Sequence, residues 1–130
     1  MICVLDTHAL VWFLQKDKKL PKKVVDIILN EEESKQVPFI VLCEIHYLHH
    51  HNRFGLSALE VRKHLEKVAS FEIMSHVPDQ LEYLDQELDI HDALIVASAR
   101  ALAKASEEEV VIFSRDEQIK KYASLPVLWE

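Results

Sequence analysis

Glycine and proline are scarce in this sequence of 130 residues, which has a single glycine, Gly55, and four prolines. One glycine is too few for a glycine-rich phosphate-binding loop and argues against an all-β fold built on many tight turns. Hydrophobic residues make up 49% of the chain, which is typical of a folded protein and not of a disordered one. This length suits one domain, residues 1–130, with one hydrophobic core.

Cysteine is scarce as well, and the start of the chain has no basic residue. Cys3 and Cys43 stand in apolar surroundings, where two free thiols in a reducing compartment are the favoured interpretation and a structural disulfide the minor one. Residues 1–14 contain no Lys or Arg, and Asp6 and His8 interrupt their apolar run. The segment fits neither a signal peptide nor a membrane span, so we expect a cytoplasmic protein.

Positive charge is in deficit, since 15 basic residues face 22 acidic ones and the net charge is -7. This balance argues against non-specific binding to nucleic acid or to acidic membranes, because both attract basic proteins. It does not exclude an enzyme that meets a phosphate through metal ions, since such a site needs concentrated carboxylates.

Short apolar runs alternate with helical patterns along the chain. The segments expected to contain strands are 2–5, 36–42, 71–74, 109–113 and 126–129. The segments expected to contain helices are 8–15, 21–29, the residues up to about 51, 57–68, 78–87, 91–105 and a short one from 116. Such alternation predicts right-handed crossovers and a central, mainly parallel sheet covered on both faces, that is, a three-layer α/β/α domain.

Four acidic residues stand at unusual places in this pattern. Asp6 and Asp116 follow predicted strands, so both should lie at the carboxyl edge of the sheet, where open α/β folds bind ligands. Asp92 stands at the start of the longest predicted helix, and Glu44 lies within an apolar run, where a carboxylate without a partner is costly to bury.

Each of these acids alone has an ordinary structural explanation. Asp92 and Asp116 could cap helices and Asp6 could be a turn residue, but capping does not explain Glu44. Packed carboxylates repel one another unless cations neutralise them, and clusters of oxygen ligands suit Mg²⁺ or Mn²⁺. Two such ions can bind the attacking water and the leaving oxygen of a phosphodiester. We therefore expect the four carboxylates to line one pocket.

The same residues resemble the motifs of the PIN-domain nucleases, and most closely those of the VapC-type toxins of prokaryotic toxin–antitoxin pairs. The resemblance rests on Asp6-Thr7-His8-Ala9-Leu10-Val11-Trp12, on Glu44 in an apolar helix after Pro38, on His91-Asp92-Ala93-Leu94-Ile95-Val96-Ala97-Ser98-Ala99, and on Ser114-Arg115-Asp116. In the last motif a hydroxyl residue precedes the final acid by two, and Ser114 stands where threonine is common. The motifs follow one another in the expected order over nearly the whole chain.

This resemblance implies a Rossmann-like parallel sheet, Mg²⁺- or Mn²⁺-dependent cleavage of RNA, and inhibition by a small partner antitoxin. The residues to which it assigns catalytic roles are Asp6, Glu44, Asp92 and Asp116. Of these, Asp6, Asp92 and Asp116 are the expected metal ligands, and Glu44 either ligates or holds a bound water. The supporting residues are Ser114 and Thr7, with Asp89 as either an outer carboxylate or a solvated loop residue.

Several other polar and aromatic residues allow more than one interpretation. The histidines His46, His49, His50 and His51 invite a zinc site, but the HExxH pattern is absent, and solvated helix histidines are favoured over contacts with RNA or with a second subunit. His8, His91 and Arg115 could approach a phosphate, or simply lie at the surface. The aromatic residues Trp12, Phe13, Tyr47 and Phe54 are expected in the core or an interface and not as base-stacking platforms.

An apolar excess on the predicted helices around 46–54 and 57–68 predicts a homodimer, and the family resemblance points the same way. The alternative is that these two helices face each other within one subunit.

Three kinds of function remain in competition at this stage. A metal-dependent endoribonuclease accounts for all four acids. A non-catalytic binding module would be a degenerate nuclease, which should lack an acid, or a receiver-like domain, which needs a lysine after a late strand where Ser114 to Asp116 stand. A phosphatase with Asp6 as nucleophile needs a second aspartate at position 8, which is a histidine. No Ser–His–Asp or Cys–His arrangement is apparent, so a cation-activated water is the expected nucleophile.

Overall fold

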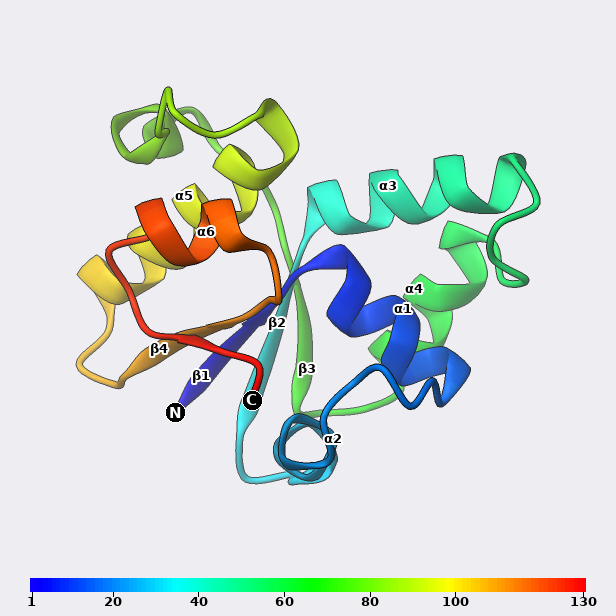
Figure 1. The fold of residues 1–130 in the computed structure, drawn as a ribbon. Coiled ribbons are helices and arrows are strands. Elements are labelled where there is room, and N and C mark those ends of the chain that lie inside the picture. Colours follow the sequence, from blue (N-terminus) through cyan, green and yellow to red (C-terminus); the bar gives the residue numbers. More distant parts are fainter.

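The centre of the fold is a five-stranded parallel sheet in the strand order β3-β2-β1-β4-β5 (Figure 1). The computed structural model describes all residues, 1–130. Its strands are β1 (Ile2–Leu5), β2 (Ser34–Pro38), β3 (Phe71–Met74), β4 (Val110–Phe113) and β5 (Val127–Leu128). Every residue of β1 and β4 is buried, which is the pattern of strands covered on both faces.

Helices cover both faces of this sheet. Those on one side are α1 (Thr7–Gln15), α2 (Lys22–Leu29), α3 (Phe39–His50) and α4 (Ala58–Glu66), and those on the other are α5 (Ile90–Ala105) and α6 (Glu117–Tyr122). The side chain of Ser57 accepts a hydrogen bond from the Glu60 N–H, and this capping box starts α4. The expected three-layer α/β/α architecture is thus confirmed.

One predicted helix is much shorter than expected. The segment 78–87 forms only a 3₁₀ helix, η1 (Pro78–Tyr83), and Leu84 is already extended. The reason is a long-range contact: the Arg100 guanidinium of α5 donates hydrogen bonds to the Tyr83 carbonyl at 2.9 Å and to the Asp85 carboxylate at 3.2 Å. These bonds hold the chain in a turn where its composition would allow a helix.

The strand order reverses next to β1. The chain passes from β1 to β2 and β3 on one side, and then returns to place β4 on the other side of β1. Ligands of open α/β sheets bind at such a switch point, beyond the carboxyl ends of the strands. The fold therefore directs attention to the residues that directly follow β1 and β4.

None of the helices combines the length and the apolar character that a span across a membrane requires.

Candidate active site

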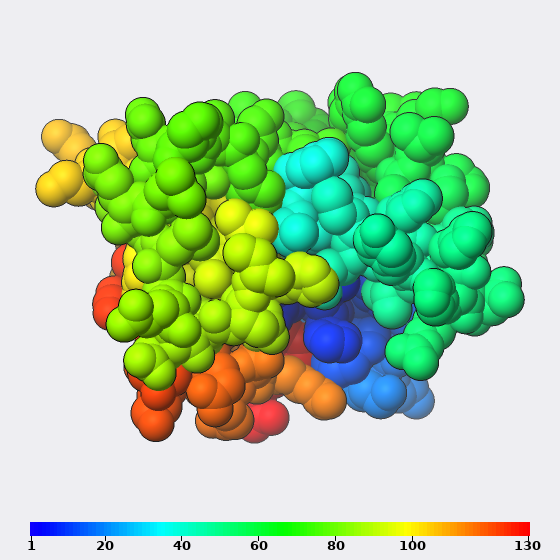
Figure 2. Space-filling model, turned by 90° about the horizontal axis from the view of Figure 1, so that it is seen from above, coloured from blue at the N-terminus to red at the C-terminus, as the bar shows by residue number.

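The four acids singled out in the sequence line one cavity of about 370 Å³ at the carboxyl edge of the sheet. Figure 2 looks onto this edge, where the first residues of α1, α3 and α5 meet the segment before α6. The residues that line it are Asp6, Thr7, His8, Glu44, Asp89, His91, Asp92, Ile95, Arg115 and Asp116. Ile95 is the only apolar member, so the cavity is built to receive a charged or polar group.

Asp6 is the most deeply buried of the four acids, with 5% of its surface exposed. It follows β1 and caps α1, because its Oδ1 accepts a hydrogen bond of 2.8 Å from the Ala9 N–H. Burial raises the pKa of Asp6 to about 6, although hydrogen bonds from Ser114 and Ala9 lower it in part. The carboxylate is therefore held in one orientation while its negative charge remains poorly compensated.

Glu44 owes its place in an apolar helix to polar partners from two other helices. The Thr7 hydroxyl donates a hydrogen bond of 2.8 Å to Glu44 Oε1. On the other side, His91 Nδ1 lies 3.8 Å from Glu44 Oε2. These contacts compensate the cost of burying a carboxylate that the sequence leaves unexplained, and they give the predicted supporting residue Thr7 a definite contact in the site.

The start of α5 carries two acids with different tasks. Asp89, not Asp92, is the cap, since Asp89 Oδ1 accepts a hydrogen bond of 3.0 Å from the Asp92 N–H. The alternative that Asp92 caps this helix is therefore wrong, because Asp92 lies within the first turn. Its carboxylate lines the cavity, where burial and then the charges of neighbouring acids, Asp116 first, raise the pKa of Asp92 to about 7.

Asp116 caps α6 with one oxygen only. Its Oδ1 accepts hydrogen bonds from the backbone N–H groups of Gln118 at 2.8 Å and Ile119 at 3.1 Å. The Ser114 side chain, which is fully buried, accepts a hydrogen bond of 3.0 Å from the Asp116 N–H. The cap interpretation of Asp116 is correct, but it leaves Oδ2 available to a ligand.

Cationic and imidazole groups stand at the rim of the cavity. The Arg115 guanidinium lies 4.7 Å from the centroid of the Trp12 ring, which is a cation–π contact. The Trp12 ring also lies 5.2 Å from that of His8 and 5.8 Å from that of Trp129. Together with His91, these groups place positive or ionisable charge around an otherwise acidic site.

The donor set of the cavity fits a hard divalent cation, since it consists of carboxylates and a hydroxyl. No three His, Cys, Asp or Glu side chains are grouped closely enough to hold one ion as they stand. Uncompensated carboxylates repel one another, and the raised pKa of Asp6 and of Asp92 has its causes in burial and in this repulsion. A cation would relieve it, with Asp6, Asp92 and Asp116 as the candidate ligands.

The histidines of residues 46–51 and the aromatic residues that the sequence singles out lie outside the cavity. The histidines His46, His50 and His51 are exposed, and His49 Nδ1 is hydrogen-bonded to the Phe54 carbonyl at 2.9 Å. Trp12 and Phe54 are buried as expected, whereas 66% of the Tyr47 side chain surface is exposed. A core position is therefore wrong for Tyr47, and an interface position stays a prediction. Polar and apolar residues are mixed around α3, so its sequence does not show which face the sheet covers.

The comparison with known families decides what kind of protein has this cavity. A sequence model of the PIN domain matches residues 3–125. The chain belongs to the PIN-domain family. The resemblance seen in the sequence motifs is thereby confirmed, and the acidic cavity lies in the fold of a nuclease family.

Solved structures share this PIN fold at low sequence identity. One chain, from the structure of VapBC2 from Rickettsia felis bound to a DNA fragment from their promoter, is 17% identical with a TM-score of 0.67, and the match covers 100% of both chains. The PIN domain endonuclease Utp24 is 16% identical with a TM-score of 0.53, over 98% of this chain and 83% of that one. Among curated proteins no match was found.

Proposed function

We propose that residues 1–130 act as one catalytic PIN domain, an endoribonuclease that cleaves RNA with Mg²⁺ or Mn²⁺ as cofactor. The observation that carries the proposal is the convergence of Asp6, Glu44, Asp92 and Asp116 in one cavity at the switch point of the sheet. A degenerate, non-catalytic member of the family would be expected to lack part of this set. A non-catalytic binding module therefore has less support than a nuclease as the function of this protein.

The roles of the side chains follow from their contacts. Asp6, Asp92 and Asp116 would hold the cations, which when bound would activate a water and neutralise charge on the phosphate. Thr7 and His91 fix the Glu44 carboxylate between them, so Glu44 can ligate or orient a water from a defined position. Ser114 supports the site by accepting a hydrogen bond from the backbone of Asp116, and its hydroxyl lowers the pKa of Asp6 in part.

Metal dependence is the direct test of this function. A short single-stranded RNA should be cut by the protein in Mg²⁺ or Mn²⁺ and left intact when EDTA is added, and renewed metal should restore cleavage. The loss should be complete within detection, because a purely oxygen-ligand site leaves no other group to activate the water. Gel analysis of end-labelled RNA measures this, and vigorous cleavage in EDTA would contradict the proposal.

The proposed biological setting is a toxin of the VapC type that acts in the cytoplasm and is inhibited by a small antitoxin. Its support is the sequence motifs and the fold shared with a chain of the VapBC2 structure. In that setting the antitoxin would mask the acidic cavity. Co-expression with the protein encoded by a short neighbouring reading frame should then yield a stable complex in which cleavage is lost.

We also propose a homodimer, with its interface on the exposed apolar residues of and directly after α4. α3 and α4 pack against each other and bury Ile45, Val61 and Leu65 between them and the core, as the intrasubunit alternative expected. Leu59 of α4 nevertheless keeps 67% of its surface exposed, and Val68 beyond it is also exposed.

Sedimentation at micromolar concentration should therefore report twice the monomer mass, because specific interfaces of standard size hold in that range. Leu59→Glu should shift the protein toward the monomer, since it places a charge in the interface. A parent protein that sediments as a monomer throughout would contradict the dimer.

A further inference from the structure

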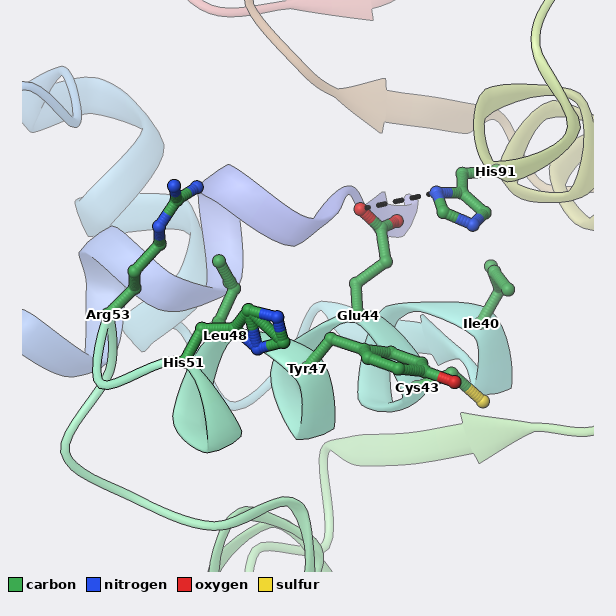
Figure 3. A pocket seen from close by; sticks show the side chains of 8 residues that line it. All are labelled: Ile40, Cys43, Glu44, Tyr47, Leu48, His51, Arg53 and His91. Carbon is green, nitrogen blue, oxygen red and sulfur yellow. Dashed lines mark ion pairs between the residues drawn. The ribbon is translucent and has the colours of Figure 1, made fainter.

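A second hollow, of about 320 Å³, adjoins the acidic cavity along α3 (Figure 3). The two share Glu44 and His91 in their walls, so they lie side by side. In Figure 3 the Glu44 carboxylate faces His91 at one end of the hollow, and Arg53 lies at the other end. Whatever occupies the acidic cavity can therefore extend into this hollow.

The hollow follows one stripe of α3. Glu44 and Tyr47, three residues apart, lie on one face of α3, and His51 follows directly after the end of the helix. At 1.5 Å per residue this stripe is about 10 Å long, enough for a nucleoside with its phosphate. Its direction leads from the proposed metal ligands toward Arg53.

The lining combines an exposed aromatic ring with a partly apolar floor. Tyr47 is two-thirds exposed, although it lies on a helix whose other apolar residues are mostly covered. Ile40 and Leu48 are half-buried beside it. An exposed ring next to a small apolar hollow is the arrangement on which nucleic-acid bases stack.

Arg53 supplies a cation without a partner. Of the four arginines, Arg62 pairs with Glu66, Arg100 with Asp85, and Arg115 stacks on Trp12. The Arg53 guanidinium is exposed and makes no hydrogen bond, ion pair or ring contact. In a protein with a net charge of -7, a free guanidinium at the end of a hollow that leads to a phosphate-processing cavity favours an anionic ligand.

We propose that this hollow is a nucleotide subsite of the RNA: Tyr47 stacks on the base next to the cleaved bond, and Arg53 binds a phosphate beyond it. The proposal rests on the proposed nuclease function. The proposed ligand is single-stranded RNA, since a base can reach the Tyr47 ring only when it is not paired. The subsite also explains how an acidic protein positions RNA, by a local cation and a stacking ring instead of an overall basic surface.

RNA binding tests this subsite in a form that does not depend on turnover. In an Asp92→Asn background with Mg²⁺ present, a fluorescently labelled single-stranded RNA is titrated at several salt concentrations. Tyr47→Ala should weaken binding about 10-fold and Tyr47→Phe should leave it near the parent value, because a phenyl ring still stacks. Arg53→Ala should reduce the slope of log K against log salt by about 0.7, the value for one lost phosphate contact on a single strand.

Matched controls come from residues outside both hollows. Leu81→Ala removes an equally exposed apolar side chain from η1, and Arg62→Ala removes an exposed arginine from α4. Neither should change RNA affinity by more than about 2-fold, and neither should reduce the salt slope by the roughly 0.7 expected for Arg53→Ala. The subsite would be overturned if Tyr47→Ala and Arg53→Ala had the same RNA affinity and the same salt slope as the two controls. It would also be overturned if the protein did not bind RNA.

Cleavage kinetics separate failure of the subsite from failure of the proposed function. In the otherwise unmodified protein, Tyr47→Ala and Arg53→Ala should raise KM with a smaller effect on kcat. Cleavage with an unchanged KM would overturn the subsite and leave the nuclease standing. No cleavage by the parent, together with RNA binding that depends on Tyr47 and Arg53, would refute the nuclease and keep the subsite. Conversion of a dimer to a monomer by Tyr47→Ala would assign this surface to a second copy of the chain and overturn the subsite.

Discussion

Asp92→Asn should abolish RNA cleavage while the protein remains folded. Among the three proposed metal ligands, Asp92 alone is not a helix cap, so the change removes a ligand and leaves the start of α5 intact. Removing even an outer partner of a metal ligand typically costs 10–100-fold in metal affinity or activity. Loss of the ligand itself should cost at least about 100-fold in kcat/KM.

The control for this variant is Asp79→Asn. Asp79 also lies in the first turn of a helical segment, η1, but it is exposed and outside the cavity. It should retain the parent rate, and circular dichroism should show both variants folded. Cleavage by Asp92→Asn at the parent rate would refute its assignment and bring back the binding-module interpretation.

The metal-free protein should become more stable as the pH falls from about 8 to about 5. The pKa of Asp6 is raised to about 6 and that of Asp92 to about 7 in the folded state, against an ordinary value of 3.8 for an aspartate in the unfolded chain. Between these limits the folded state binds more protons than the unfolded state, so the free energy of unfolding decreases as the pH rises. For Asp92, which is partly exposed, we expect a change of about 1–2 kcal/mol after solvent screening.

Below this window the trend should reverse, because the pKa values of Glu60 and Asp85 are lowered by their hydrogen bonds and their stabilisation is lost as they take up protons. Thermal unfolding in EDTA at several pH values measures the effect. Asp92→Asn should flatten the slope between pH 5 and 8 and should unfold at a higher temperature than the parent at pH 8. Parallel pH curves for parent and variant would contradict the electrostatic account of the site.

Added Mg²⁺ or Mn²⁺ should stabilise the folded protein, because a bound cation neutralises the same carboxylates. A ligand that binds only the folded state at 100 times its Kd adds about 2.7 kcal/mol of stability. The gain should be largest near pH 8 and smaller near pH 5, where protons compete for the carboxylates. Asp6→Asn should weaken it, and an equal gain in variant and parent would show that Asp6 is not a ligand.

Much of the fold was predictable because short stretches of sequence are enough to identify its strands. β1 and β4 are uninterrupted apolar runs, and such runs belong to strands buried on both faces. The segment after Tyr83 was not predictable, since its turn depends on Arg100, which also donates hydrogen bonds to the carbonyls of Tyr122 and Ala123. No local sequence pattern predicts these hydrogen bonds, because they join residues that are far apart in the chain.

The candidate site also has features that the sequence predicts and features that it does not. Asp6 and Asp116 could be placed from the ends of the strands before them, because the carboxyl ends of parallel strands share one edge. The division of work between Asp89 and Asp92 could not be foreseen, since both stand within one turn and only one can cap. The exposure of Tyr47 could not be foreseen for a different reason: polar and apolar residues are mixed around α3, so its sequence does not show which side meets solvent.

The contact between Arg115 and Trp12 should make the intrinsic tryptophan fluorescence sensitive to ligands in the acidic cavity. Trp12 and Trp129 are the only two tryptophans of the chain; both are buried, and their rings meet edge to face. Arg115 lies between this pair and the acidic cavity, since it contacts the Trp12 ring and lines the cavity as well. A phosphate that drew the guanidinium off the indole would change the polarity around Trp12, so we expect the intrinsic tryptophan emission to change when the cavity is occupied.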